Sequence, residues 1–169
     1  EWTFKELSAS DTDEIYRIAQ LEYAVFPDPW SEKEIKNTLQ QDHTFCVAAK
    51  CCDIVLGYFI CYFVLDECEV ARIAVAEDAR CRGIGQNLFE NMIDICRRKG
   101  LGRILLDVRK SNRTAIRFYE KNHFQVDGIR RNYYGGTAPE DAILMSRDVL
   151  IPKLTEEENV SSVSFSLNM

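Results

Sequence analysis

The chain has 169 residues, 46% of them hydrophobic and 28% charged, which is typical of one globular domain that folds without a disulfide or a metal. Its 27 acidic and 21 basic residues give a net charge of −6, which argues against a nucleic-acid binder and suits a basic or amine-bearing partner. Seven cysteines without a C-x-x-C pair and two isolated histidines predict reduced thiols, no metal site and a cytoplasmic protein.

The first half of the chain is predicted to form a short strand, two helices and then three further strands. A short strand over 3–7 precedes a helix that Ser10 or Asp11 can cap. Ser31 and Glu34 have the spacing of a capping box, which predicts the start of a second helix. Strand-like runs over 44–50, 54–65 and 69–75 predict an antiparallel meander. No run is long enough for a transmembrane helix and no signal peptide is recognised, so no membrane partner is expected.

The second half of the chain alternates helices and strands. A helix over 85–99 stops at Gly100, and a buried strand follows over 103–108. Because a helix crosses between them, the strands over 69–75 and 103–108 are expected to be parallel neighbours. Asn112 caps a helix that runs to residue 121, and two last strands are expected over 126–134 and 142–149. These elements predict an α/β (α+β) single domain, with a mixed central sheet flanked by helices on both faces.

The C-terminal segment 153–169 is expected to lie outside this domain, which ends at about residue 152. Hydrophobic and polar residues alternate from residue 163 to residue 169 with a period of two. We therefore expect the segment to form an added strand.

Gly83, Ile84 and Gly85 lie between a predicted strand and a predicted helix, where nucleotide-binding motifs place their glycines. The dinucleotide motif G-x-G-x-x-G does not fit, because Leu88 replaces its third glycine and seven residues separate the glycines from the strand. The segment 80–86 offers successive backbone N–H groups at a helix N-terminus beside two arginines, which suits a pyrophosphate. A plain glycine turn is the alternative.

The pattern Arg80-x-x-Gly83-x-Gly85 resembles the acetyl-CoA signature of the GNAT acetyltransferases, and the resemblance covers nearly all of residues 3–150. Four further stretches are similar to the bacterial ribosomal-protein-alanine N-acetyltransferases of that family. These stretches are 26–31 (FPDPWS), 107–112 (DVRKSN), 130–134 (RRNYY) and 140–143 (EDAI). The resemblance implies the GNAT fold and an acyltransferase that uses acetyl-CoA as co-substrate.

The resemblance places acetyl-CoA against a strand, a loop and a helix start. Ile73, Ala74 and Val75 would offer backbone groups to the pantetheine arm. The loop residues that would wrap the pyrophosphate are Cys81, Arg82, Gly83, Ile84, Gly85 and Gln86. Asn112 would contact the cofactor near its thioester, and a plain helix cap is the alternative role for it.

The resemblance also implies how the acceptor is held and how the thiol leaves. Phe26, Tyr133 and Tyr134 match positions that flank a peptide N-terminus, although paired tyrosines are also common in half-buried strands. Tyr119 matches the general acid beside the cofactor sulfur, and its alternative is a core aromatic. His123 stands where the family usually has glycine, and we expect the left-handed turn to persist there.

Two carboxylates compete for the role of general base. Asp107 matches the family's base, although it is one methylene shorter than the glutamate of the ribosomal enzymes, so a bridging water is expected. Glu69 begins the strand on which other acetyltransferases of this fold carry their base. Residues 69, 71 and 73 of a regular strand share one face, so Glu69 is expected to point towards the amine. An exposed strand-end acid is the alternative for both.

Three functions are compatible with this pattern. The first is acetyl transfer to a protein N-terminal amine, with the N-terminal alanine of a small-subunit ribosomal protein as the favoured acceptor. The second keeps the chemistry but acetylates lysine side chains, polyamines or another small amine. The third is an acetyl-CoA-binding module with little turnover.

Overall fold

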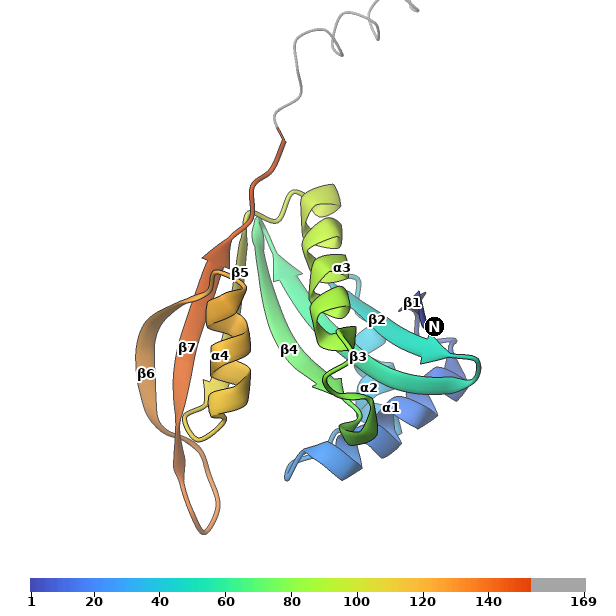
Figure 1. Cartoon of the computed structure of the whole chain (residues 1–169), viewed down its shortest axis with the longest axis horizontal. Coiled ribbons are helices and arrows are strands. Elements are labelled where there is room, and N and C mark those ends of the chain that lie inside the picture. The colour runs from blue at the N-terminus through green and yellow to red at the C-terminus, as the bar shows by residue number, and fades with distance from the viewer. Residues whose placement is uncertain (153–169) are drawn as a thin grey trace, which may run out of the picture.

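The computed structural model describes residues 1–152, in which seven strands form one mixed sheet (Figure 1). The strands are β1 (Thr3–Leu7), β2 (Thr44–Cys51), β3 (Ile54–Val64), β4 (Glu67–Val75), β5 (Arg103–Arg109), β6 (Gln125–Tyr134) and β7 (Glu140–Asp148). The helices are α1 (Thr12–Val25), α2 (Glu32–Leu39), α3 (Ile84–Lys99) and α4 (Arg113–Lys121), with a short 3-10 helix at Glu77–Ala79. The sheet order is β1-β2-β3-β4-β5-β7-β6, which confirms the predicted α/β class. The strand predicted within 153–169 lies outside the described residues.

The helix signals in the sequence correspond to hydrogen bonds in the structure. The Ser31 hydroxyl oxygen accepts the Glu34 N–H at 3.2 Å and so caps α2. Asn112 Oδ1 accepts the Ala115 N–H at 3.2 Å and caps α4. Gly100 ends α3 with a φ of 71°, a left-handed conformation that glycine adopts without strain. His123 takes the same region after α4, with a φ of 68°, as expected.

The sheet separates two hydrophobic clusters, because successive side chains of a strand point to opposite faces. In β2, Phe45 and Val47 pack in the cluster that includes α3 and α4, whereas Cys46 and Ala48 pack in the cluster that includes α1 and α2. Helices therefore cover both faces, as Figure 1 shows. Each fully buried large side chain contributes about 1.5–3 kcal/mol to the stability of the fold.

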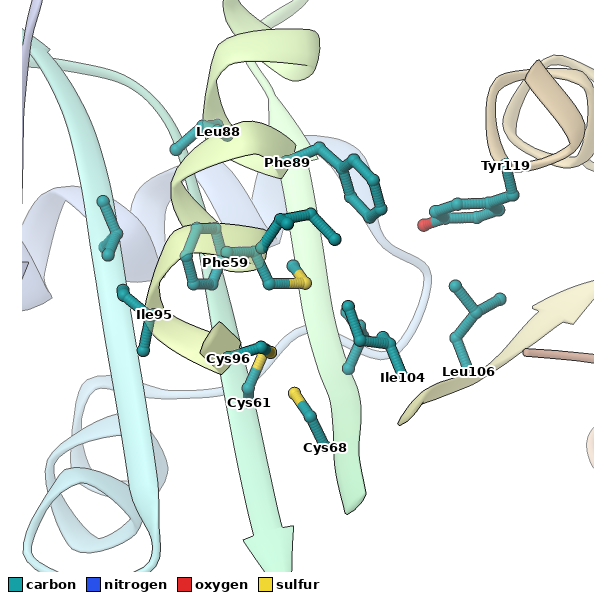
Figure 2. Packing of buried hydrophobic residues seen from close by; sticks show 14 of the residues in the cluster. Phe59, Cys61, Cys68, Leu88, Phe89, Ile95, Cys96, Ile104, Leu106 and Tyr119 are labelled. Atoms are coloured by element: carbon teal, nitrogen blue, oxygen red, sulfur yellow. The ribbon is translucent and has the colours of Figure 1, made fainter. Parts of the chain in front are cut away.

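The cysteines behave as the sequence predicts. All seven are free, and Cys46, Cys61, Cys68 and Cys96 are buried. The last three lie together in the larger cluster, as Figure 2 shows. Burial raises the pKa of the Cys61 thiol, which disfavours the reactive thiolate.

The strands β4 and β5 diverge, and this divergence creates the central feature of the fold. Their parallel pairing covers three residue pairs, from Glu67–Arg103 to Glu69–Leu105. Beyond that point β4 continues to Val75 and β5 to Arg109 without pairing to each other (Figure 1). On its far side β5 is paired with β7 along its whole length. The sheet is thus split at its centre, and the split reaches both of its faces.

Candidate active site

The free edge of β4 faces the split between β4 and β5. Residues 70–75 have no partner in β5, so backbone groups on this edge are available to a ligand. The residues expected to contact pantetheine, Ile73, Ala74 and Val75, all lie in this stretch. Arg80 donates from Nε to the Val75 carbonyl oxygen at 3.2 Å and ties the following loop to the end of the strand.

The turn into α3 has the geometry of an anion site. Gly83 is the N-cap residue, and its φ of 86° is strained for residues with a side chain. The first bond of the helix joins the Asn87 N–H to the Gly83 carbonyl oxygen at 3.0 Å, so the N–H groups of residues 84–86 have no acceptor within the helix. A Cβ added at Gly83 would meet no atom within 4 Å. These donors and the positive end of the helix dipole suit a pyrophosphate.

Several residues expected at the cofactor also have structural roles. The Gln86 and Asn122 side-chain amides exchange two hydrogen bonds, at 2.8 and 3.1 Å, so Gln86 can offer a cofactor its backbone N–H. Asn112 is exposed and is the cap of α4 that its alternative role predicts. Cys81 and Arg82 are exposed, and Cys81 has a φ of 64°.

Tyr119 lies on the same side of the sheet as the α3 N-terminus. Its side chain packs against Phe118 and Phe124, with ring centroids 5.6 and 5.4 Å away, and the residue is 7% exposed. Figure 2 shows the ring extending from α4 towards Phe89 and Leu106. Burial raises the pKa of the phenol, so it keeps its proton at neutral pH.

The candidate bases lie on the opposite face. A cavity of about 540 Å³ is lined by both Glu69 and Asp107, together with Tyr133, Leu105 and other residues of the sheet. Asp107 is half-buried. Its neighbours in β5, Leu106 and Val108, belong to the cluster that packs against α3 and α4, so the Asp107 side chain points away from those helices. The structure therefore brings Asp107, Glu69 and Tyr133 to one cavity.

The expected orientation of Glu69 is wrong in one respect. The strand β4 contains a bulge, because Ile60 pairs with Arg72 while the next residue of β3, Cys61, pairs with Val70. The extra residue, Ala71, breaks the alternation of side chains. Glu69 therefore does not share a face with Ile73. Glu69 and Arg72 share the face of the sheet that α1 covers. The cavity lined by Glu69 and Asp107 lies on this face.

The two consecutive tyrosines are brought together by a second irregularity. Between Arg130 and Tyr134 the β6–β7 register slips, and Asn132 adopts a φ of 53°. In a regular strand Tyr133 and Tyr134 would point to opposite faces, but their ring centroids are 5.1 Å apart. Tyr133 is 46% exposed. Burial, followed by the negative charge of Asp107, raises the pKa of Tyr134.

Phe26 follows α1, and it does not line the cavity that holds the two carboxylates. Its ring stacks under the Arg72 guanidinium, with the Arg72 Cζ 4.0 Å from the ring centroid. The loop of residues 26–30 nevertheless reaches the tyrosine side of the site. Arg109 lies 3.9 Å from the Asp28 carboxylate, and its Cζ lies 4.1 Å from the Tyr134 ring centroid.

Sequence reasoning missed the charged residues that connect these parts, namely Glu22, Asp28, Arg72 and Arg109. The sequence does indicate that Glu22 is buried, because it continues the apolar stripe of α1 that contains Ile15 and Ile18. A carboxylate in such a stripe needs a buried partner. The sequence does not say which cation provides it.

Two further findings concern the described part of the chain. Within residues 1–152, no three His, Cys, Asp or Glu side chains are grouped so that they could hold a metal ion. In the same residues, no helix is long and apolar enough to cross a membrane.

The chain is similar to known acetyltransferases. Residues 12–124 match the Acetyltransferase (GNAT) family. The [ribosomal protein bS18]-alanine N-acetyltransferase of Escherichia coli (strain K12) is 35% identical over 146 residues, covering 85% of this chain and 95% of that protein. The crystal structure of the ribosomal-protein-S18-alanine N-acetyltransferase from Escherichia coli superposes with a TM-score of 0.81 at 31% identity, covering 90% of this chain and 97% of that one. The crystal structure of Ard1 from Thermoplasma volcanium superposes with a TM-score of 0.76 at 27% identity, covering 88% of this chain and 98% of that one. The chain therefore belongs to the GNAT family and is an acetyl-CoA-dependent acetyltransferase.

Proposed function

We propose that the enzyme acetylates the N-terminal α-amine of a protein, with the N-terminal alanine of a small-subunit ribosomal protein as its acceptor. The observation that carries the proposal is the two-sided split of the sheet. A helix N-terminus suited to pyrophosphate lies on one side, and a cavity with two carboxylates lies on the other. Donor and acceptor can thus approach from opposite faces. The similarity to the bS18-alanine enzyme supports the choice of acceptor.

In this proposal residues 1–152 form the catalytic domain, and acetyl-CoA supplies the activated acetyl group as a thioester. Residues 84–86 donate backbone hydrogen bonds to its pyrophosphate, and the free edge of β4 at Ile73, Ala74 and Val75 binds the pantetheine arm. Asn112 would contact the cofactor near its thioester. The fit rests on the unpaired N–H groups at the start of α3 and the open space over Gly83.

Asp107 is assigned as the general base and Tyr119 as the general acid. An N-terminal ammonium has a pKa of about 7.7–8.0, so it must lose a proton before it attacks, and Asp107 accepts that proton directly or through a water. The nitrogen forms a bond to the acetyl carbon as the carbon–sulfur bond breaks, and the second proton that the nitrogen loses to become an amide passes to water. Tyr119 donates its proton to the departing sulfur and regains one from water afterwards. Burial raises the pKa of Tyr119, so the phenol is protonated when the thioester is attacked.

The acceptor class is tested by release of free CoA thiol with a panel of amines. The panel contains a peptide with N-terminal alanine, the same peptide with a blocked N-terminus and an internal lysine, and a polyamine. We expect turnover with the first peptide alone. Equal rates on the blocked lysine peptide or turnover limited to the polyamine would overturn the proposed acceptor, and tight acetyl-CoA binding without turnover would overturn the enzymatic assignment.

The choice between the two bases is tested with Asp107→Asn and Glu69→Gln, each of which removes one negative charge from the same cavity. We expect Asp107→Asn to lower kcat/KM by about 10²–10⁴-fold and to change its dependence on pH. Glu69→Gln serves as the matched control. Full activity of Asp107→Asn together with a loss in Glu69→Gln would reverse the assignment.

A further inference from the structure

A buried ion pair joins Glu22 of α1 to Arg72 of β4. It also contacts β3 through Tyr58 and lies next to the loop of residues 26–30. The Glu22 carboxylate is 0% exposed and accepts from Arg72 Nε at 2.8 Å and from Arg72 Nη2 at 3.1 Å. It also accepts from the Tyr58 hydroxyl at 2.6 Å and from the Trp30 N–H at 3.4 Å. This carboxylate therefore connects two strands to the loop, and its charge is compensated by the guanidinium.

Arg72 makes further contacts to the same loop. Its Nη2 donates to the Asp28 carbonyl oxygen at 3.2 Å. Its Cζ lies 4.0 Å from the Phe26 ring centroid and 5.3 Å from the Trp30 ring centroid. One guanidinium thus holds the first, the middle and the last residue of a five-residue loop.

The bulge at Ala71 decides that Arg72 reaches this loop. Val70 points towards α3, and in a regular strand residue 72 would share that face, inside the larger hydrophobic cluster. The extra residue in β4 turns Arg72 to the face covered by α1, where it pairs with Ile60 in the register. Glu69, a candidate base, lies on the same face.

We infer that Arg72, paired with Glu22, is a positioning residue for the acceptor: it fixes the 26–30 loop against the acceptor side of the site and so sets the affinity for the incoming amine. The inference rests on the proposed function, because that function makes the loop a wall of the acceptor groove. Arg72 acts through Phe26 and the loop backbone and touches no reacting atom. A planar guanidinium suits this task, since it forms bidentate bonds in its plane and stacks on aromatic rings with its faces.

The inference predicts a separation between acceptor and donor binding. Arg72→Lys keeps the positive charge beside Glu22, but an ammonium cannot form the bidentate pair, reach the Asp28 carbonyl oxygen and stack as a plane at once. We expect the KM for the acceptor to rise about tenfold or more, because the loop that lines the acceptor groove is displaced and the loss of one hydrogen bond to a charged group there corresponds to about tenfold in affinity. The Kd for acetyl-CoA, measured by calorimetry, should change by less than about twofold, since its site lies on the other face.

A second variant distinguishes a loss of acceptor affinity from a general loss of stability. Glu22→Gln/Arg72→Met removes both charges together, so neither is left buried and uncompensated, and Gln keeps an acceptor for Tyr58 and Trp30. Its Tm should remain close to that of the wild type while its acceptor KM rises as in Arg72→Lys. The matched control is Glu14→Gln, which removes a different buried carboxylate of α1 that binds Lys5 and Lys50 and not the loop. This control should leave the acceptor KM unchanged.

The position of the 26–30 loop can also be followed by tryptophan fluorescence, without measuring enzymatic turnover. In a Trp2→Phe background, Trp30 is the remaining tryptophan. Acrylamide should quench its fluorescence more strongly in Arg72→Lys than in the parent or in Glu14→Gln.

The kinetic comparison uses whichever amine the wild-type enzyme acetylates, so failure on alanine peptides would overturn the proposed acceptor and leave this test intact. An acceptor KM within about twofold of wild type in both folded variants would overturn the inference. Equal changes in acceptor KM and acetyl-CoA Kd would also overturn it, because the network would then support the fold as a whole.

Discussion

Replacing Gly83 by valine tests the cofactor site, and α3 supplies its own control. Gly83 and Gly100 lie at the two ends of this helix, both in the left-handed region, with φ of 86° and 71°. A Cβ at either position would meet no atom within 4 Å, so both substitutions cause backbone strain rather than a clash. The strain amounts to about 1–2 kcal/mol at each position. For a domain of this size, we expect Tm to fall by about 2–8 °C in both variants.

Only Gly83 borders the N–H groups that are proposed to hold the pyrophosphate. A side chain there keeps the phosphates away from at least one N–H donor, and a hydrogen bond to a charged group is worth about 1.5–3 kcal/mol. We therefore expect calorimetry to show the acetyl-CoA Kd of Gly83→Val raised by about 10–150-fold, with Gly100→Val close to wild type. Equal Kd values in the two variants, at similar Tm, would refute the placement of the cofactor at this turn.

Three further predictions address stability and proton donation. Gly57→Ala puts a Cβ 2.9 Å from a backbone oxygen of β4, so we expect a loss of about 1–3 kcal/mol in denaturant unfolding; an unchanged midpoint would contradict the packing. Hydrogen bonds from Lys5 and Lys50 lower the pKa of Glu14 from 4.5 to about 2, so its charge stabilises the fold above pH 4.5. The difference in free energy of unfolding between wild type and Glu14→Gln should therefore shrink as pH falls from 4.5 to 2. A difference that does not depend on pH would contradict this role of Glu14. Tyr119→Phe should lower kcat and leave the acetyl-CoA Kd unchanged; an unaltered kcat would remove its role as the acid.

The local sequence predicted the elements of this fold well. The capping signals at Ser31 and Asn112 correspond to hydrogen bonds, and the stop at Gly100 corresponds to a left-handed residue. The parallel pairing of β4 with β5 followed from the crossover helix between them. These features depend on contacts between residues that are near in sequence, or on the handedness of the chain, so a single sequence carries them.

Side-chain direction within the strands was less predictable. A period of two tells which residues share a face only while a strand is regular, and neither the bulge at Ala71 nor the slip around Asn132 has a clear local signal. The first changes the face of Glu69 relative to Ile73, and the second brings Tyr133 and Tyr134 into contact. Both irregularities depend on the register with a neighbouring strand.

The sequence by itself determined the strands, the helices, the glycine turn and the family resemblance of this protein, because these reside in short-range patterns and motifs. Tertiary structure alone decided how far β4 and β5 pair before they separate, and which buried charges find each other. Glu22 and Arg72 are 50 residues apart, and their pairing depends on how α1 packs on β3 and β4. A buried carboxylate requires a partner for its charge, but only the packed fold selects that partner from the many cations in the chain.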